Sequence, residues 1–220
     1  MRTVIFDLDG TLMDTSRDLI AAANSRFRAL GLGDVLDPVA DAGTALRGGR
    51  AMLTLGFSRT GSHGPEEVDR QYQPLLAAYS EAIDTHTTLY PGAMEAVAAL
   101  GAAGYAVGIC TNKPEGLAQE LLVRMGVRDA FASLVGADTL PVRKPDAAPL
   151  VEAVRRAGGD PARSCLVGDS DTDRKTSAAA GVPSILVTFG PAGGDMAALR
   201  PEALLHHFDD LVQVVDALGL

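Results

Sequence analysis

Residues 3–11 read Thr-Val-Ile-Phe-Asp-Leu-Asp-Gly-Thr, and the architecture of the chain can be worked out from this stretch. Its first four residues are apolar or β-branched, which is typical of a buried strand. Two carboxylates, Asp7 and Asp9, follow at once, and Gly10 favours a turn. In open parallel sheets, ligands bind at the carboxyl ends of the strands. The stretch therefore predicts a buried strand with a ligand site at its end.

The rest of the chain alternates strand-like and helical patterns. Four further short apolar runs predict strands at 105–110, 133–135, 165–167 and 184–187. Helical patterns lie at 92–100, 115–125, 149–157, 171–180 and 209–218. Such alternation is typical of a parallel sheet with helices on both faces. We therefore predict an α/β fold with a Rossmann-like core.

Residues 14–84 break this alternation. The segment holds no convincing strand and predicts helices at 16–30, around 50–55 and at 66–83. Helices segregated in one block indicate a separate domain. We therefore expect a core made of residues 1–13 and 85–220, with an all-α domain, 14–84, inserted after the first strand.

Composition and charge limit the partners of the chain. Among 220 residues, 19 Lys and Arg stand against 28 Asp and Glu, a net charge of −9 that repels nucleic acid. Apolar stretches are too short to span a membrane, and no leader pattern opens the chain. The two cysteines, Cys110 and Cys165, lie in apolar runs that suit reduced, buried thiols. We expect a cytoplasmic protein that binds neither nucleic acid nor membrane.

Polar clusters follow the predicted strands one after another. Beside Asp7 and Asp9, the sequence TNK stands at 111–113, KP at 144–145 and GDSDTD at 168–173. Because the carboxyl ends of parallel strands share one edge, all four clusters should converge there. Any one of them alone would be read as a turn or a helix cap, but the ordered set predicts one catalytic site.

The residue types in these clusters suit phosphoryl transfer. Asp7 and Asp9 can serve as nucleophile and general acid/base if the turn re-aims the second carboxylate. A carboxylate and a phosphate dianion repel each other, so a divalent cation and fixed donors must offset their charges. Mg²⁺ takes oxygen ligands and suits Asp7, Asp169 and a backbone carbonyl. Thr111 and Lys144 would bind the transferred oxygens.

These clusters, FDLDGTL, CTNK, KP and VGDSDTD, give the chain a close resemblance to phosphatases of the haloacid dehalogenase superfamily. The chain is most similar to the phosphoglycolate phosphatase branch, with which it shares a helical insert, a YPG segment and a C-terminal FDDL. The resemblance implies an α-helical cap domain over a Rossmann-like core and a requirement for Mg²⁺. It also implies hydrolysis of a small phosphorylated metabolite, with 2-phosphoglycolate the leading candidate.

The resemblance assigns the chemical steps to the first two acids. Asp7 would attack phosphorus and form an aspartyl-phosphate. Asp9 would protonate the leaving alkoxide, deprotonate the hydrolytic water and offer Mg²⁺ its backbone carbonyl. Because dehalogenases of the superfamily lack the second acid, the pair implies phosphoryl transfer.

The resemblance also assigns the binding residues. Thr111 and Asn112 would hold phosphate oxygens, and Lys144 would neutralise both nucleophile and phosphate. Asp169 would bind Mg²⁺ directly, whereas Asp173 would orient Lys144 or the waters of the metal.

Substrate choice is expected to lie in the inserted helices. Arg47 and Arg50 flank two glycines and would present guanidinium groups to a substrate carboxylate, although solvated helix-end arginines would look the same. Lys113 is less strongly indicated than Lys144 as a residue that contacts substrate.

The exposed helices of the insert would also allow a homodimer.

Three other activities stay open at this point. A β-phosphoglucomutase-like enzyme would return the phosphoryl group to a sugar, and a pyrophosphatase would use the same clusters. A receiver-like signalling module also phosphorylates an aspartate on a parallel sheet. That module, however, carries its phosphorylated aspartate in the middle of a shorter chain and has no helical insert.

Overall fold

The computed structural model describes residues 1–190 and 195–220, and these form two compact units. One unit comprises Met1–Met13 and Leu89–Leu220, and the other comprises Asp14–Thr88. Among the described residues, no helix is both long enough and apolar enough to cross a membrane.

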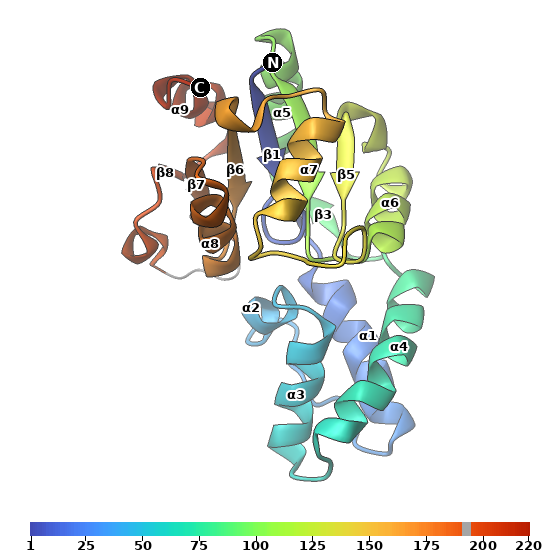
Figure 1. The fold of residues 1–220 in the computed structure, drawn as a ribbon. Coiled ribbons are helices and arrows are strands. Elements are labelled where there is room, and N and C mark those ends of the chain that lie inside the picture. Colours follow the sequence, from blue (N-terminus) through green and yellow to red (C-terminus); the bar gives the residue numbers. More distant parts are fainter. Residues whose placement is uncertain (191–194) are drawn as a thin grey trace. The chain divides into compact units, whose positions relative to one another are not determined.

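A six-stranded parallel sheet forms the centre of the first unit (Figure 1). Its strand order is β5-β4-β1-β6-β7-β8. The bounds are β1 (Thr3–Phe6), β4 (Ala106–Cys110), β5 (Ser133–Val135), β6 (Ser164–Gly168), β7 (Ser184–Val187) and β8 (Ala203–Leu205). Strand β1 pairs with β4 on one side and β6 on the other, which places the acids after Phe6 between two other strand ends.

Helices cover both faces of this sheet, as the alternation predicted. They are α5 (Ala93–Ala102), α6 (Glu115–Arg124), α7 (Ala148–Arg156), α8 (Asp171–Ala180) and α9 (Leu211–Ala217). In Figure 1, α7 and α8 lie in front of the sheet and α5 lies behind it. Buried Ile5 and Leu166 of the sheet pack with Leu150 and Val154 of α7 in one apolar cluster. This burial stabilises the sheet that carries the polar clusters.

Two details at the C-terminal end differ from the prediction. The sixth strand, β8, was not expected, because three residues of Ala-Leu-Leu carry no periodicity that identifies a strand. The expected helix at 209–218 is shorter, since Phe208–Asp210 form a 3₁₀ turn before α9 begins.

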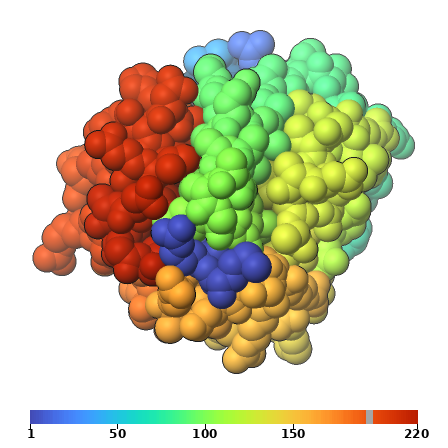
Figure 2. Space-filling model, turned by 90° about the horizontal axis from the view of Figure 1, so that it is seen from above, coloured from blue at the N-terminus to red at the C-terminus, as the bar shows by residue number. Residues whose placement is uncertain are grey.

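The amino-terminal residues are hydrogen-bonded at the amino-terminal ends of the strands, opposite the ends that carry the polar clusters. Figure 2 shows them in blue, among segments coloured green, orange and red. Arg2 donates a hydrogen bond to the carbonyl of Ala103 (3.1 Å), and the amide of Asp160 donates to that of Met1 (3.2 Å). These bonds fix the start of β1 and hence the position of its other end.

The second unit consists of helices: α1 (Ser16–Ala29), α2 (Ala42–Ala45), α3 (Gly49–Thr60) and α4 (Pro65–Glu81). The Phe27 and Phe57 rings meet edge to face at 5.3 Å between centroids in its apolar interior. The short α2 was not predicted, because four residues are too few to show a helical period.

The second unit ends at Thr88, four residues beyond the predicted boundary at 84. The buried carboxylate of Asp18 on α1 explains the difference. It accepts hydrogen bonds from the amides of His86 (2.9 Å) and Thr87 (2.9 Å) and from the Thr87 hydroxyl (2.8 Å). The returning chain is thus held to α1. Strands β2 (Met13–Asp14) and β3 (Thr88–Leu89) pair where the chain passes between the units.

Candidate active site

The polar clusters converge at the carboxyl ends of β1, β4 and β6, as predicted. The amide of Asp7 continues the sheet by donating to the carbonyl of Val167 on β6 (2.8 Å). The amide of Thr111 donates to the carbonyl of Val135 on β5 (3.0 Å). Sheet hydrogen bonds therefore fix the backbone at the start of these two clusters.

The turn after β1 redirects the chain at Asp9. Gly10 adopts φ +83°, a left-handed conformation that side chains other than glycine rarely take. Its amide donates to the carbonyl of Met13 (2.9 Å), while the amide of Leu12 donates to that of Leu8 (3.0 Å). This tight loop gives the carboxylates of Asp7 and Asp9 different surroundings.

Lys144 lies at the centre of one group of acids. Its ammonium Nζ is 2.7 Å from Asp173 Oδ1 and 3.1 Å from Asp7 Oδ1, and its side chain is 1% exposed. Burial lowers the pKa of Lys144, but the charges of Asp173 and Asp7 more than reverse this effect and raise it above its usual value. Lys144 is therefore a permanent positive charge beside the Asp7 carboxylate.

Asp7, Asp169 and Asp173 form a cluster whose ligand atoms lie within 4.8 Å of one another. Burial raises the pKa of Asp7 to about 6, against the attraction of Lys144. Burial, with the charges of Asp173 and Asp7, raises the pKa of Asp169 well above its usual range. When all three carboxylates are ionised, they leave an excess of two negative charges over the single ammonium, which a divalent cation would offset. The oxygen-only donor set fits such a cation.

Hydrogen bonds orient these carboxylates. The Thr11 hydroxyl donates to Asp169 Oδ1 (3.3 Å), and the Ser170 hydroxyl donates to Asp173 Oδ2 (2.6 Å). Ser170 is also the N-cap of α8, where its oxygen accepts from the Asp173 amide. A Cβ at Gly168 would stand 2.3 Å from the Asp173 carboxyl carbon, so only glycine allows this approach. Asp173 is thus aimed at Lys144 by groups on both sides.

The TNK cluster joins its neighbours through several hydrogen bonds. The Thr111 hydroxyl oxygen accepts from the amide of Lys113 (3.1 Å), which leaves its proton to be donated elsewhere. Asn112 Nδ2 donates to the carbonyl of Lys144 (3.0 Å), at the cis peptide bond between Lys144 and Pro145. Asn112 therefore supports the loop that carries Lys144, a contact that the sequence did not suggest.

Lys113 pairs with Asp9. Its ammonium Nζ lies 2.8 Å from Asp9 Oδ1 and 3.1 Å from Oδ2, and its side chain is 4% exposed. Sequence reasoning ranked Lys113 below Lys144 and gave it no partner. Each lysine in fact contacts one acid of the first cluster, Lys144 contacting Asp7 and Lys113 contacting Asp9.

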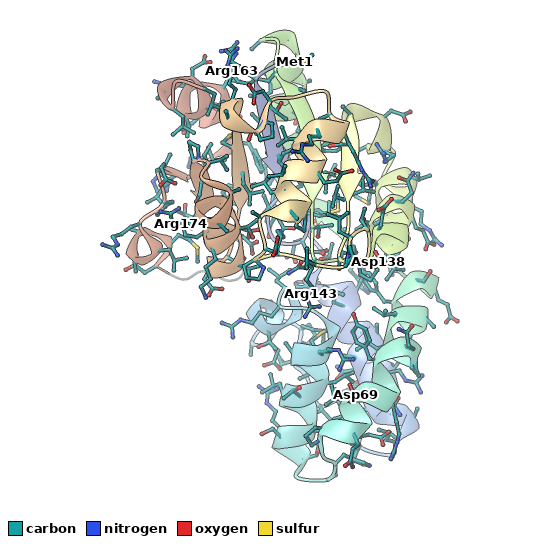
Figure 3. All side chains as sticks on the ribbon, in the orientation of Figure 1. Met1, Asp69, Asp138, Arg143, Arg163 and Arg174 are labelled. Atoms are coloured by element: carbon teal, nitrogen blue, oxygen red, sulfur yellow. The ribbon has the colours of Figure 1, made fainter. Side chains whose placement is uncertain are left out.

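The loop between β5 and α7 brings Lys144 to the site. Asp138 and Arg143, which Figure 3 labels, lie in this loop, at the carboxyl ends of the strands. The carboxylate of Asp138 accepts from the amide of Glu115 (2.7 Å), and the amide of Ala137 donates to the carbonyl of Lys113 (2.9 Å). The loop is therefore bonded to the TNK cluster at several points.

The two arginines of the second unit differ in their contacts. Arg50 pairs with Asp69 and lies over the Tyr72 ring, 4.6 Å from its centroid. Arg47 is exposed, just before the start of α3. Arg50 is thus engaged within its own unit.

Thr11, Ser170 and Gly168 were not recognised as site residues from the sequence. Thr11 and Gly168 belong to the quoted clusters, yet their roles depend on side chains from other strands or the next helix turn. Ser170 precedes a predicted helix, where a serine is typical of an N-cap and does not by itself indicate a site. The signal that could have found them is their position within two residues of an acid.

The chain is similar in sequence to known hydrolases. The family model of the haloacid dehalogenase-like hydrolases matches residues 1–181. A phosphoglycolate phosphatase of Mesorhizobium japonicum is 39% identical, over 94% of this chain and 92% of the relative. A phosphoglycolate phosphatase of Agrobacterium fabrum is 38% identical, over 97% of this chain and 91% of the relative.

Solved structures share the fold. A crystal structure described as a predicted phosphoglycolate phosphatase from Haemophilus somnus has a TM-score of 0.85 at 24% identity, and 97% of each chain is covered. Together with the family match and the convergence of the four clusters, these findings show that the chain belongs to the haloacid dehalogenase-like hydrolases.

Proposed function

We propose that this phosphoric monoester hydrolase acts on 2-phosphoglycolate through an aspartyl-phosphate on Asp7. One observation carries the proposal: Asp7 and Asp9 stand two residues apart at a strand end, each beside its own buried lysine. The substrate is suggested by the relatives, which are phosphoglycolate phosphatases. Their names favour hydrolysis over the mutase, pyrophosphatase and receiver alternatives.

The two acids divide the chemistry. A carboxylate oxygen of Asp7 attacks phosphorus, and the bond from phosphorus to the alkoxide breaks as the new P–O bond forms. Asp9 gives its proton to the departing alkoxide, and then takes a proton from the water that attacks phosphorus. The bond from phosphorus to the Asp7 oxygen breaks in this second step, which releases phosphate and the free carboxylate. Lys144 holds the Asp7 carboxylate by its charge, and Thr111 and Asn112, with Lys144, would bind phosphate oxygens.

We propose that Asp7, Asp169 and the backbone carbonyl of Asp9 would hold Mg²⁺. Bound there, Mg²⁺ would neutralise charge on the nucleophile and the phosphate. Asp173 keeps Lys144 in place through a hydrogen bond of 2.7 Å. The domain boundaries also belong to this proposal: we take the second unit as the cap of the family, with Arg47 or Arg50 contacting the substrate carboxylate. Since Arg50 already pairs with Asp69, Arg47 is the better candidate.

The test is phosphate release by the wild type and by Asp7→Asn from 2-phosphoglycolate, sugar phosphates, nucleotides and pyrophosphate, with Mg²⁺ or with EDTA. We expect 2-phosphoglycolate to lead in kcat/KM by about a hundredfold, close to 2.7 kcal/mol of selectivity. Asp7→Asn should abolish turnover. The matched control is Asp171→Asn, whose exposed carboxylate pairs with Lys175 and should not matter. A different leading ester would overturn the substrate, and an active Asp7→Asn variant would overturn the nucleophile.

We propose that the protein works in the cytoplasm, where thiols such as the buried Cys110 and Cys165 stay reduced. A homodimer stays a prediction, which sedimentation velocity would check.

A further inference from the structure

The contact between Lys113 and Asp9 is built into the fold. The side chain of Lys113 is 4% exposed and that of Asp9 is 13% exposed, so the pair lies largely out of water. The ammonium contacts both carboxylate oxygens, at 2.8 Å and 3.1 Å. Charge-assisted bonds to both oxygens restrict rotation of the carboxylate much more than one neutral bond would.

The backbone of Lys113 is held as well. Its amide donates to the Thr111 hydroxyl (3.1 Å), and its carbonyl accepts from the amide of Ala137 (2.9 Å). The lysine therefore starts from a fixed point of the TNK cluster and reaches across to the loop after β1. Burying a lysine costs desolvation free energy, which only a well-paired opposite charge offsets.

We propose that Lys113 is the positioning residue of the general acid/base: it holds the carboxyl group of Asp9 in the orientation required for proton transfer. The inference rests on the proposed role of Asp9. A general acid/base acts only within hydrogen-bond reach of the atom that gains or loses the proton, so loss of orientation lowers the rate of proton transfer. Lys144, in contrast, contacts Asp7 and would act on the nucleophile.

The proposal has a chemical signature. A leaving group whose alcohol or phenol is a weak acid needs a proton as it departs, whereas 4-nitrophenoxide, whose phenol is a stronger acid, leaves without one. If Lys113 positions Asp9, its loss should harm poor leaving groups and spare good ones. A residue that merely bound phosphate or supported the fold would affect all esters alike.

The experiment measures kcat/KM at saturating Mg²⁺ for phenyl, 4-chlorophenyl and 4-nitrophenyl phosphate, since this constant reports the steps up to departure of the phenol. The variants are Lys113→Met, Lys113→Arg and, as a matched control, Lys175→Met, which removes an exposed lysine paired with Asp171. Lys113→Met should lose about tenfold or more on phenyl phosphate relative to 4-nitrophenyl phosphate. Lys113→Arg, which keeps a charged donor, should recover part of the loss, and Lys175→Met should behave as wild type.

A uniform rise in KM with unchanged leaving-group dependence would overturn the proposal and assign Lys113 to substrate binding. A uniform fall in kcat/KM together with a lower Tm in Lys113→Met would also overturn it, in favour of a structural role.

Asp9→Asn separates this inference from the function on which it rests. We expect Asp9→Asn to show the same steep leaving-group dependence, and Lys113→Met to add little to it in the double variant. If Asp9→Asn keeps the wild-type dependence, the proposed role of Asp9 fails. If Asp9→Asn is steep and Lys113→Met is not, only the role of Lys113 fails.

Discussion

The carboxylate of Asp173 lies directly against the backbone of Gly168, and this contact gives the site one of its most demanding positions. A Cβ at residue 168 would come within 2.3 Å of the carboxyl carbon, a distance that no relaxed side chain tolerates. Asp173 is 1% exposed and bonds Lys144, so the carboxylate has little room to retreat. Gly168→Ala should therefore displace Asp173 and lower kcat about tenfold or more, with a loss of about 1–3 kcal/mol in stability.

Gly116→Ala is the matched control, because a Cβ there meets nothing within 4 Å in the first turn of α6. Steady-state kinetics and thermal unfolding of both variants check the prediction. Wild-type kinetics in Gly168→Ala would show that Asp173 does not need its observed position.

At this scale the sequence predicted which acids and lysines gather, but not every contact between them. Asp7, Lys144, Asp169 and Asp173 could be placed together because each comes after the carboxyl end of a strand in a parallel sheet, Asp169 and Asp173 both after β6. The partner of Lys113 could not be predicted, because no sequence pattern shows which acid a long side chain contacts across a loop.

At the scale of elements, packing between α1 and α3 depends on the absence of a side chain. A Cβ at Gly56 on α3 would lie 2.1 Å from the Phe27 ring of α1. Alanine favours a helix over glycine by about 1 kcal/mol, but forcing this ring aside costs about 1–3 kcal/mol. Gly56→Ala should therefore lower the stability of the protein despite its better helix propensity.

The opposite sign is expected for Gly101→Ala on α5. A Cβ at Gly101 has no neighbour within 4 Å, so only the propensity gain of about 0.5–1 kcal/mol remains. Thermal or urea unfolding of the two single variants measures both effects. Equal shifts of the same sign would mean that packing against Phe27 has no influence.

Elements with a clear period could be predicted, and short ones could not. Helix α8 begins and ends at the predicted residues, Asp171 and Ala180, between an N-cap at Ser170 and a C-cap at Gly181. Strand β8 and helix α2 are held by neighbours, β8 by pairing with β7. Three or four residues carry too few positions for a period of 2 or 3.6 to be visible.

At the scale of the whole molecule, the buried acids link folding to pH and to the metal. The pKa of Asp7 is about 6 in the folded protein, against an ordinary value of 3.8, because burial disfavours the charged form. A raised carboxyl pKa means that the folded state binds the proton more tightly than the unfolded chain. The free energy of folding gained from the protonated Asp7 carboxyl is therefore complete below pH 3.8 and is lost as the pH rises through 6.

This loss for Asp7 is on the order of 3 kcal/mol, and Asp169, whose pKa is also raised, acts in the same direction. In EDTA, the Tm difference between Asp7→Asn and the wild type should therefore grow in favour of the variant from pH 4.5 to pH 7.5, since the amide cannot ionise.

Mg²⁺ binds the ionised carboxylates, so it should raise the wild-type Tm more at pH 7.5 than at pH 5. Differential scanning fluorimetry with and without Mg²⁺ tests both expectations. In Asp169→Asn, which lacks one of the proposed ligands, the Mg²⁺ shift should shrink; an undiminished shift there, or one independent of pH, would place the metal elsewhere than at these acids.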